Sequence, residues 1–466
     1  MISSPSTASS LSAKAPKSDL FDQSALSALA QRLVEAAKRA GADAADAVAV
    51  RGVSQGVEVR DGRVEESERS EGDDVGLRVL VGQRQAVVST NDISGDGIAK
   101  LAERAVAMAR VAPDDKYVGL ADPALLARDF PDLDLLDPEV PSTTELERRA
   151  QEAEAAALAV KGVSKSGGAS ASAGIGGMVL VTSTGFHGSY LRSSQGISMT
   201  AISGEGTGME RDYDYTTAPH AADLESPEHV GRIAGERTVA RANPRKVETC
   251  EVPVVFDPRV SGSLVGHLVG AVNGASIARK TSFLKDRLGE QLFSKNIRII
   301  DDPLRKRGLR SQTFDAEGVT VKKLAIIDEG VLTTWLLDCA TARELGLVTT
   351  GHAHRGVSSS PSPGPYNLHL EAGEPTPAEL MSDIKQGFYV TDLIGSGVNG
   401  VTGDYSRGAS GFWIENGKPT YPVSEVTIAG HLLEIFKSMV AANDLEFRYG
   451  VNAPTVRIEG LTLGGR

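Results

Sequence analysis

The chain has few cysteines, few aromatic residues and no long apolar run. Its 466 residues include only Cys250 and Cys339, which lie far apart and form no CxxC pair. This usage argues against a disulfide-based fold and fits a reduced, cytoplasmic setting. No apolar run approaches the ~18 residues of a membrane-spanning helix, so we expect no membrane association. With 5% aromatic residues, the core must be built mainly from Val, Ile, Leu and Ala.

Basic residues are outnumbered by acidic ones. The net charge is −12 and the pI is near 5.3, which argues against binding nucleic acid through a broad basic face. The basic clusters at 305–307 and 322–323 are short and lie between strand-like runs, so we expect solvated loops there. Residues 1–19 are rich in Ser, Ala and Pro without an apolar segment, which predicts a disordered tail and no secretory signal.

Glycine is abundant, with 50 residues against roughly 33 expected at about 7% usage. Together with many strand-like runs, this predicts numerous turns. The segment Asn243–Lys246 is the best domain boundary. We therefore predict an α+β fold in which residues 20–243 form a mixed domain of antiparallel strands and long helices, and residues 244–466 form a β-rich domain with a packed helix.

Hydrophobic periodicity and capping residues place the individual elements. Helices are expected at about 22–40, 98–111, 142–160, 226–242, 259–278 and 431–442, with a short one from Thr376. Strands are expected at 47–50, 57–60, 75–81, 86–90, 178–181, 189–191, 197–205, 212–216, 252–256, 297–300, 324–327, 331–337, 367–371, 388–394, 411–415 and 456–461. Ser142 and Glu145 are expected to form a capping box.

Two short motif matches lack the structural context that their chemistry needs. Residues 395–400 match GxGxxG, but a hairpin rather than a helix follows, and the helix N-terminus is what holds a pyrophosphate. Residues 52–56 match GxSxG, but a strand follows where a nucleophile elbow requires a helix. We therefore expect no nucleotide site at 395–400 and a loop at 52–56.

His352 and His354 are a stronger candidate for a metal site. Alternate residues on a strand share a face, so both imidazoles could reach one metal, with His369 as a third ligand. The flanking Thr-Thr-Gly and Arg-Gly favour a loop instead. Solvated or hydrogen-bonded loop histidines are the preferred interpretation, and the metal site is kept as an alternative.

The run Gly403–Gly417 is the most informative segment. Glycines bracket Asp404, Tyr405, Ser406 and Arg407, and a strand-like Phe-Trp-Ile that includes Trp413 then ends at a Glu-Asn-Gly turn. On local grounds this is a glycine-rich hairpin on a sheet. We expect its polar side chains to lie in a loop, because glycine-rich loops allow close backbone approach.

The same run resembles a signature of the TldD/PmbA family of zinc-peptidase-related proteins, and the closer match is to the PmbA (TldE) branch. The resemblance runs from about residue 20 to the C-terminus and is strongest after residue 250. It is carried by Ala278–Leu284, Asp301–Pro303, Thr349–Gly356, Gly403–Gly417, Tyr421–Val423, Thr427–Gly430 and Pro454–Gly460.

The resemblance also implies where the chemistry of this family should lie. In the catalytic branch, a helix carries HExxxH, whose two His bind zinc from one face while the Glu takes a proton from the zinc-bound water. Aligned on Arg279-Lys280, these positions fall on Gly266, His267 and Ala271. Gly and Ala cannot bind a metal, the C-terminal Cys ligand is missing, and no HExxH or HExxxH occurs in the chain. The helix is then expected to use its small residues for close packing, with His267 a hydrogen-bonded structural or cleft histidine.

We therefore predict a non-catalytic subunit that needs no cofactor of its own. Its partner would be a TldD-like chain that holds the zinc, and the complex would act on unfolded or extended peptides in the cytoplasm, as the resemblance implies. The expected cleft or partner residues are Arg279, Asp404, Tyr405, Ser406, Arg407 and Trp413. The first alternative is a stand-alone metal-dependent hydrolase built from His352, His354, His369, His267 or Asp404. The second alternative is a scaffold unrelated to proteolysis.

Overall fold

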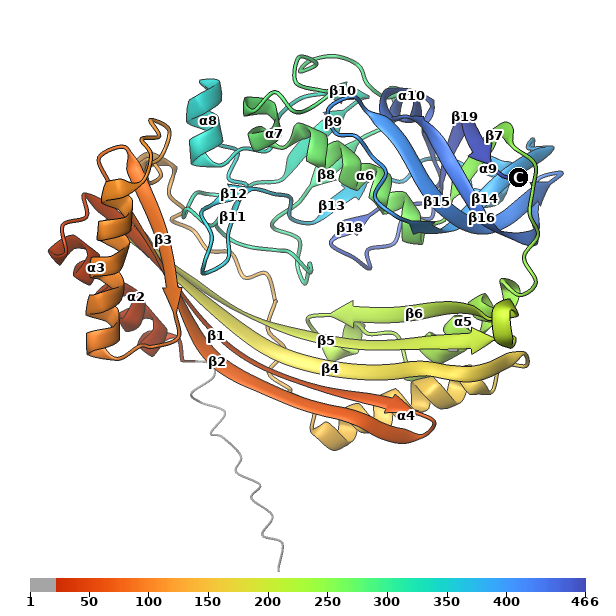
Figure 1. The fold of residues 1–466 in the computed structure, drawn as a ribbon, viewed down its shortest axis with the longest axis horizontal. Helices are drawn as coiled ribbons and strands as arrows, with labels where there is room; N and C mark the ends of the chain where they lie inside the picture. Colours follow the sequence, from red (N-terminus) through yellow and green to blue (C-terminus); the bar gives the residue numbers. More distant parts are fainter. Residues whose placement is uncertain (1–21) are drawn as a thin grey trace, which may run out of the picture.

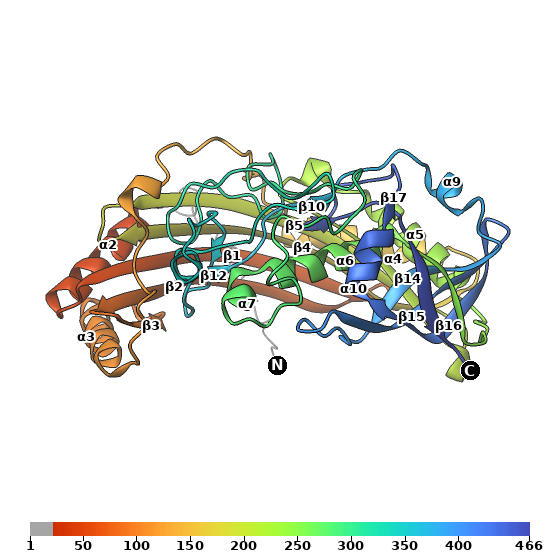
Figure 2. The ribbon, with the colours of Figure 1, turned by 90° about the horizontal axis from the view of Figure 1, so that it is seen from above.

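A computed structural model of the chain describes residues 22–466 and shows two parts, a long curved sheet and a β-rich unit above it (Figure 1). The predicted α+β fold class is confirmed. The tail predicted at residues 1–19 lies outside the described residues. Seen from above, the long strands of the sheet run beneath the β-rich unit (Figure 2).

The N-terminal sheet is antiparallel, with strand order β3-β2-β1-β4-β5-β6. Its strands are β1 (Ala44–Arg60), β2 (Arg63–Val81), β3 (Arg84–Thr90), β4 (Val163–Thr182), β5 (His187–Ser203) and β6 (Glu210–Ala218). The sequence predicted short pieces in their place. Gly52 and Gly56 suggest that the strand is interrupted, because glycine has a low strand propensity. In the structure β1 is hydrogen-bonded to β2 and β4 at both residues, so the strand continues through them.

Four helices cover the convex face of this sheet (Figure 1). They are α2 (Ser24–Arg39), α3 (Gly95–Val111), α4 (Thr143–Leu158) and α5 (Pro227–Ala240). Successive side chains of a strand point to opposite faces. Thus Ala45, Ala47 and Ala49 of β1 pack under α2 and α3, and Val57 and Val59 pack under α4 and α5.

Helices α4 and α5 pack unusually closely. A Cβ added at Gly231 of α5 would lie 1.9 Å from the carbonyl oxygen of Ala153 in α4, so only glycine fits there. At the start of α4, Ser142 accepts a hydrogen bond from the Glu145 N–H as predicted. The reciprocal half of the capping box is wrong, because the Glu145 carboxylate instead accepts hydrogen bonds from Arg148 and Arg149.

The C-terminal unit contains a closed barrel. Its strand order is β16-β15-β14-β7-β19, and β16 pairs with β19 to complete the ring. The strands are β7 (Cys250–Phe256), β14 (Gln386–Ile394), β15 (Asp404–Glu415), β16 (Lys418–His431) and β19 (Val456–Gly464). Strand β16 was not predicted, because Pro419 and Pro422 disfavour a strand. Both prolines lie where the β15–β16 register shifts, so the ladder tolerates them.

A second, smaller sheet and several short elements complete this unit. The sheet order is β10-β9-β8-β13-β18, with β8 (Ile299–Asp301), β9 (Leu324–Asp328), β10 (Val331–Leu332), β13 (Leu368–Leu370) and β18 (Val451–Asn452). The other elements are α6 (Pro258–Val272), α7 (Gly274–Ala278), α8 (Cys339–Leu345), α9 (Pro377–Met381), α10 (Leu432–Ser438), β11 (Ala353–His354), β12 (Ser362–Pro363) and β17 (Val440–Ala441).

The single helix predicted at 259–278 is wrong, because Asn273 divides it into α6 and α7. Asn273 has an extended backbone, with φ −64° and ψ 123°, and its side-chain oxygen accepts from the Ala275 N–H. The Gly274 N–H donates to the Leu336 carbonyl instead of continuing the helix. The break is set by this tertiary contact, which periodicity cannot reveal.

A buried ion cluster joins the two parts of the chain. The Asp46 carboxylate of β1 lies 2.6 Å from Arg78 of β2 and 2.5 Å from Arg355 of the C-terminal unit. All three side chains are at most 4% exposed. Burial alone would raise the pKa of Asp46, but the positive charges of Arg355 and Arg78 outweigh it and lower that pKa. The cluster therefore fixes how the sheet and the β-rich unit sit together.

Candidate functional site

Helix α6 holds the positions that correspond to the metallopeptidase motif. Asp257 caps it through the Arg259 N–H, and Pro258 follows as its first residue. One side of the helix is buried in the barrel core through Leu264, Val265, Leu268, Val269 and Val272. This apolar face fixes the helix, so the opposite face is presented outward.

The outward face of α6 is open. A Cβ added at Gly266 or Gly270 would meet no atom within 4 Å. The expectation that these small residues serve close packing is therefore wrong for both glycines. It holds only near the ends of the segment, where added carbons would lie 3.2 Å from the Val451 carbonyl at Gly262 and 2.7 Å from the Leu336 carbonyl at Gly274. The exposed glycines leave room over the helix backbone.

His267 lies beside this open face and points to Tyr405 of β15. The two rings meet edge to face, with centroids 5.8 Å apart. Neither the His267 Nε2 nor the Tyr405 hydroxyl has a hydrogen-bond partner within residues 22–466, although both atoms are buried. The hydrogen-bonded histidine that the sequence suggested is thus not what the structure contains. Burial, and then the positive charge of Arg407, lower the pKa of His267, which keeps the ring neutral near pH 7.

Two segments that resemble the family motifs, Ala278–Leu284 and Gly403–Gly417, meet near the C-terminal end of α6. The Ser282 hydroxyl donates to the Ala271 carbonyl at 2.6 Å, and the Phe283 N–H donates to the Gly400 carbonyl at 3.0 Å. The Gly403 backbone lies close to both Phe283 and His431. The sequence could identify the motifs but not that they share one place.

The glycine-rich run is mostly strand rather than loop. Its residues from Asp404 onward belong to β15, because β14 and β16 pair with them on either side. Asp404 and Ser406 are exposed, and Tyr405 between them is buried, which is the alternation of a strand. Arg407 donates to the Ile394 carbonyl at 3.3 Å.

Two of the other candidates lie elsewhere. Trp413 is 6% exposed and belongs to the barrel core, so the expectation of a cleft residue is wrong. Its indole packs into the core because successive side chains of β15 point alternately to the two faces of the barrel wall. Arg279 ends α7 with an exposed side chain. Of the predicted set, only Tyr405 and Arg407 act directly on the α6 histidine.

The three histidines of the alternative metal site are not brought together. His352 and His354 both pack on Tyr366, with ring centroids 5.3 and 4.6 Å from it, whereas His369 contacts Phe447. His352 Nε2 lies 3.3 Å from the Asp301 carboxylate, an acidic partner that local spacing did not reveal. Within the part of the chain that the structure describes, no three His, Cys, Asp or Glu side chains are arranged to hold a metal.

The chain matches three successive family models. They are described as PmbA/TldA metallopeptidase domain 1 at residues 45–109, the central domain at 136–242 and the C-terminal domain at 249–465. This chain belongs to the PmbA/TldD family. The metalloprotease PmbA of Escherichia coli is 39% identical over 88% of this chain and 90% of its own length.

Solved structures show the same fold. A candidate modulator of DNA gyrase from Bacteroides thetaiotaomicron superposes with a TM-score of 0.87 at 27% identity, covering 95% of this chain and 99% of that one. TldE from Thermococcus kodakarensis superposes with a TM-score of 0.83 at 19% identity, covering 94% of this chain and all of that chain. The second likeness concerns the fold alone. No helix within residues 22–466 is long and apolar enough to cross a membrane.

The residues of α6 do not fit the zinc of a metallopeptidase. Gly266 is exposed and has no side chain, and Ala271 is 4% exposed in the barrel core. Five residues of an α-helix turn through about 500°, so these two positions face directions about 140° apart. Neither position can supply a ligand, as the sequence predicted, and His267 alone cannot replace a ligand set.

Proposed function

We propose that this chain is a non-catalytic, PmbA/TldE-type subunit of a cytoplasmic metallopeptidase complex. Its partner would be a TldD-like chain with an intact HExxxH helix and its zinc, and the substrates would be unfolded or extended peptides. The observation that carries the proposal is α6 itself. The helix keeps its place against the barrel but offers Gly266, His267 and Ala271 where two ligands and a base would be required.

The surroundings of α6 support a role in contacts with another molecule. The buried His267 Nε2 and Tyr405 hydroxyl lack protein partners, and each such group costs about 1–3 kcal/mol. Ile394 ends β14 and Val401 lies in the following loop to β15, and these side chains are 64% and 57% exposed. An apolar edge beside unsatisfied polar groups is suited to being covered by a second chain, with an interface above roughly 1,000 Å².

The first test is reconstitution. The chain and the TldD-like chain of the same organism are purified separately, mixed at micromolar concentration and analysed by size-exclusion chromatography with light scattering. We expect one complex, with peptidase activity that is absent from either chain alone and is removed by a chelator. Separate elution, or equal cleavage by the partner alone, would show that the subunit proposal is wrong.

The second test locates the contact. Ile394→Asp places a charge on the apolar edge beside the α6 site and should weaken the complex by at least about tenfold, because an unpaired charge must be desolvated. Val348→Asp is the matched control, since Val348 is 69% exposed and lies outside this edge. Equal effects of both variants would place the interface elsewhere.

A further inference from the structure

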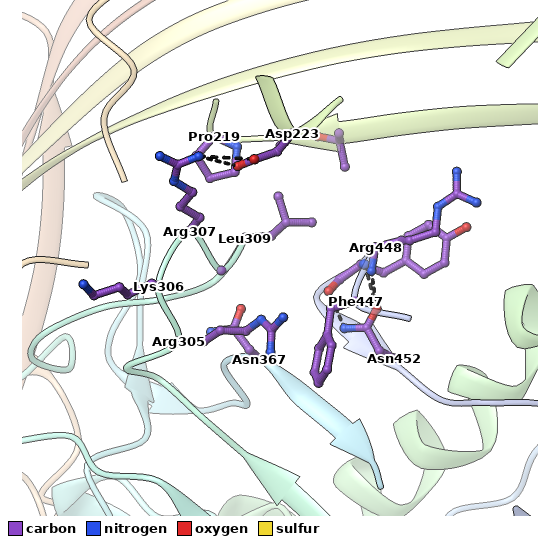
Figure 3. Close-up of a pocket in the computed structure, with 14 residues that line it drawn as sticks. Pro219, Asp223, Arg305, Lys306, Arg307, Leu309, Asn367, Phe447, Arg448 and Asn452 are labelled. Carbon is purple, nitrogen blue, oxygen red and sulfur yellow. Dashed lines mark hydrogen bonds and ion pairs between the residues drawn. The ribbon is translucent and has the colours of Figure 1, made fainter. Parts of the chain in front are cut away.

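The basic segment at 305–307 is a loop with Lys306 and Arg307 exposed, as the sequence predicted, and it also lines a cavity. The cavity has a volume of about 210 Å³ and lies between the end of β6 and the C-terminal unit (Figure 3). Four cationic side chains line it, and the only lining carboxylate belongs to Asp223. The cationic residues are Arg305, Lys306, Arg307 and Arg448. In a chain of net charge −12, such a concentration of positive charge calls for a specific explanation.

The acidic residue of the cavity is already neutralised. Arg307 donates to both oxygens of Asp223, at 3.2 and 3.0 Å, and also to Asp134 at 2.6 Å. Figure 3 shows this pair at one rim, with Arg307 turned away from Arg305. Arg448 donates to the Tyr215 carbonyl at 3.2 Å. These contacts leave Arg305 as the guanidinium available to a ligand.

Arg305 is held in place without an ionic partner. Its guanidinium lies 3.4 Å from the centroid of the Phe447 ring, a cation–π contact that holds it against the ring. It forms no ion pair with a carboxylate anywhere in residues 22–466, and its side chain is half-buried. Burial lowers the pKa of Arg305, and the nearby charge of Asp302 only partly offsets this effect. A desolvated, oriented and unpaired guanidinium is a preformed half of an anion site.

The walls of the cavity are rigid. The Asn367 side chain accepts from the Arg310 N–H at 2.9 Å and donates to the Asp302 carbonyl at 2.7 Å, which holds the 305–310 segment. On the opposite wall, the Asn452 side chain accepts from the N–H groups of Arg448 and Tyr449 at 2.9 and 2.8 Å. Both amides are used for shaping the backbone, and the exposed Lys306 side chain is directed away from Arg305 (Figure 3). Arg305 is therefore the main group that would meet the charge on a ligand.

We propose that this cavity binds a carboxylate group of a peptide, with Arg305 as its principal donor. A planar guanidinium can bind a carboxylate with two parallel hydrogen bonds. The cavity is smaller than the roughly 300–1,000 Å³ of a pocket for a whole small molecule. It therefore fits one group of a longer chain that continues outside, either a C-terminal carboxylate or an Asp or Glu side chain. The choice of a peptide as carrier rests on the proposed function, whereas the anion site itself does not.

The test uses the full chain without a partner, so that its failure is distinguishable from failure of complex assembly. Binding of three rhodamine-labelled peptides is measured by fluorescence anisotropy. The first has a free carboxyl terminus and no acidic side chain, the second has an amidated terminus and one central Glu, and the third is amidated with Gln in place of Glu. We expect the first or the second to bind at least about tenfold more tightly than the third, and which one does so identifies the source of the carboxylate.

Variants assign the effect to the cavity. Arg305→Gln should reduce the affinity of the favoured peptide to that of the neutral one. Arg305→Lys keeps the charge but loses the fork and should give an intermediate affinity. Lys322→Gln removes an equal charge from an exposed site outside the cavity and should change nothing. Arg305→Met keeps an apolar side chain on the Phe447 ring. It replaces Arg305→Gln if that variant has a lowered melting temperature.

Three results would overturn the proposal. The first is equal binding of all three peptides by the unmodified chain, which needs no variant to interpret. The second is unchanged affinity in folded Arg305→Gln or Arg305→Met. The third is displacement of the peptide by inorganic phosphate at a lower concentration than by an acidic peptide, which would make this a phosphate site.

Discussion

Because one face of α6 is open, we predict that replacing its glycines by alanine stabilises the protein, whereas most substitutions beside a core destabilise it. Glycine in a helix interior is about 1 kcal/mol less favourable than alanine, because it loses more backbone entropy on folding. Added methyl groups at Gly266 and Gly270 meet no atom within 4 Å. Each Gly→Ala change should therefore stabilise the protein by about 0.5–1 kcal/mol, and the double variant by about 1–2 kcal/mol.

The matched control is Gly231→Ala in α5. Its helix-propensity gain is the same, but the new methyl group would lie 1.9 Å from the Ala153 carbonyl oxygen. Overpacking of this kind costs about 1–3 kcal/mol, so a net destabilisation is expected.

Urea unfolding followed by circular dichroism measures all four variants, and the slopes are compared to ensure that the same transition is observed. A thermal shift of roughly 2–4 °C per kcal/mol is expected for a unit of about 200 residues. If Gly266→Ala destabilised the chain by 1 kcal/mol or more, something would cover α6 in the isolated chain. The reasoning about its open face would then fail.

Two further predictions concern the buried charges. Asp46→Asn removes the anion that the buried Arg78 and Arg355 share, so it should lower the free energy of unfolding by about 3–5 kcal/mol. The control Asp73→Asn, in the partly exposed pair with Arg51, should lower it by about 1 kcal/mol or less. Equal losses in urea titrations would contradict this prediction. Burial, and then the electrostatic effect of the neighbouring His352, lower the pKa of His354 to about 4. The folded chain thus binds fewer protons than the unfolded chain between pH about 6.5 and 4, so stability should fall as pH falls through this window, by about 1.4 kcal/mol per pH unit. His354→Gln should remove that slope, and an unchanged slope would refute it.

Much of the fold could be predicted because its local signals agree with its tertiary structure. Ser226 and Pro227 begin α5, the Thr376 capping box begins α9, and the Asp61-Gly62 turn joins β1 to β2. Each of these signals depends on a few neighbouring residues. The elements they define would form in the same place under many tertiary arrangements.

The predictions that were wrong concern elements that depend on contacts far along the chain. Strand β16 contains two prolines and exists because β15 and β19 pair with it, and α6 ends at Asn273 because Leu336 takes over the next backbone contact. The glycines of the run from Asp404 favour a loop, whereas pairing with β14 and β16 makes it a strand. Long-range pairing decides all three cases, and a single sequence does not record it.

At the candidate site, too, local motifs could be predicted from the sequence and long-range contacts could not. The motifs at Ala278–Leu284 and Gly403–Ser406 could be recognised in the sequence, as could the missing ligands in α6. That Tyr405 faces His267, and that Arg305 lies on Phe447, depends on contacts between segments more than a hundred residues apart. Nothing in the residues next to these side chains in the sequence indicates such long-range contacts.

The energetics of the site argue that α6 works in contact with another molecule. A helix used only for packing gains nothing from glycines on an open face, because alanine would be more stable there. Nor does it gain from a buried His267 Nε2 that faces the equally unpartnered Tyr405 hydroxyl of β15. A helix that bound zinc would need side chains that Gly266 and Ala271 lack. This is why we propose that the unsatisfied groups and the open surface at α6 are completed from outside the chain. A second subunit or a peptide backbone would supply both the missing hydrogen bonds and the missing volume.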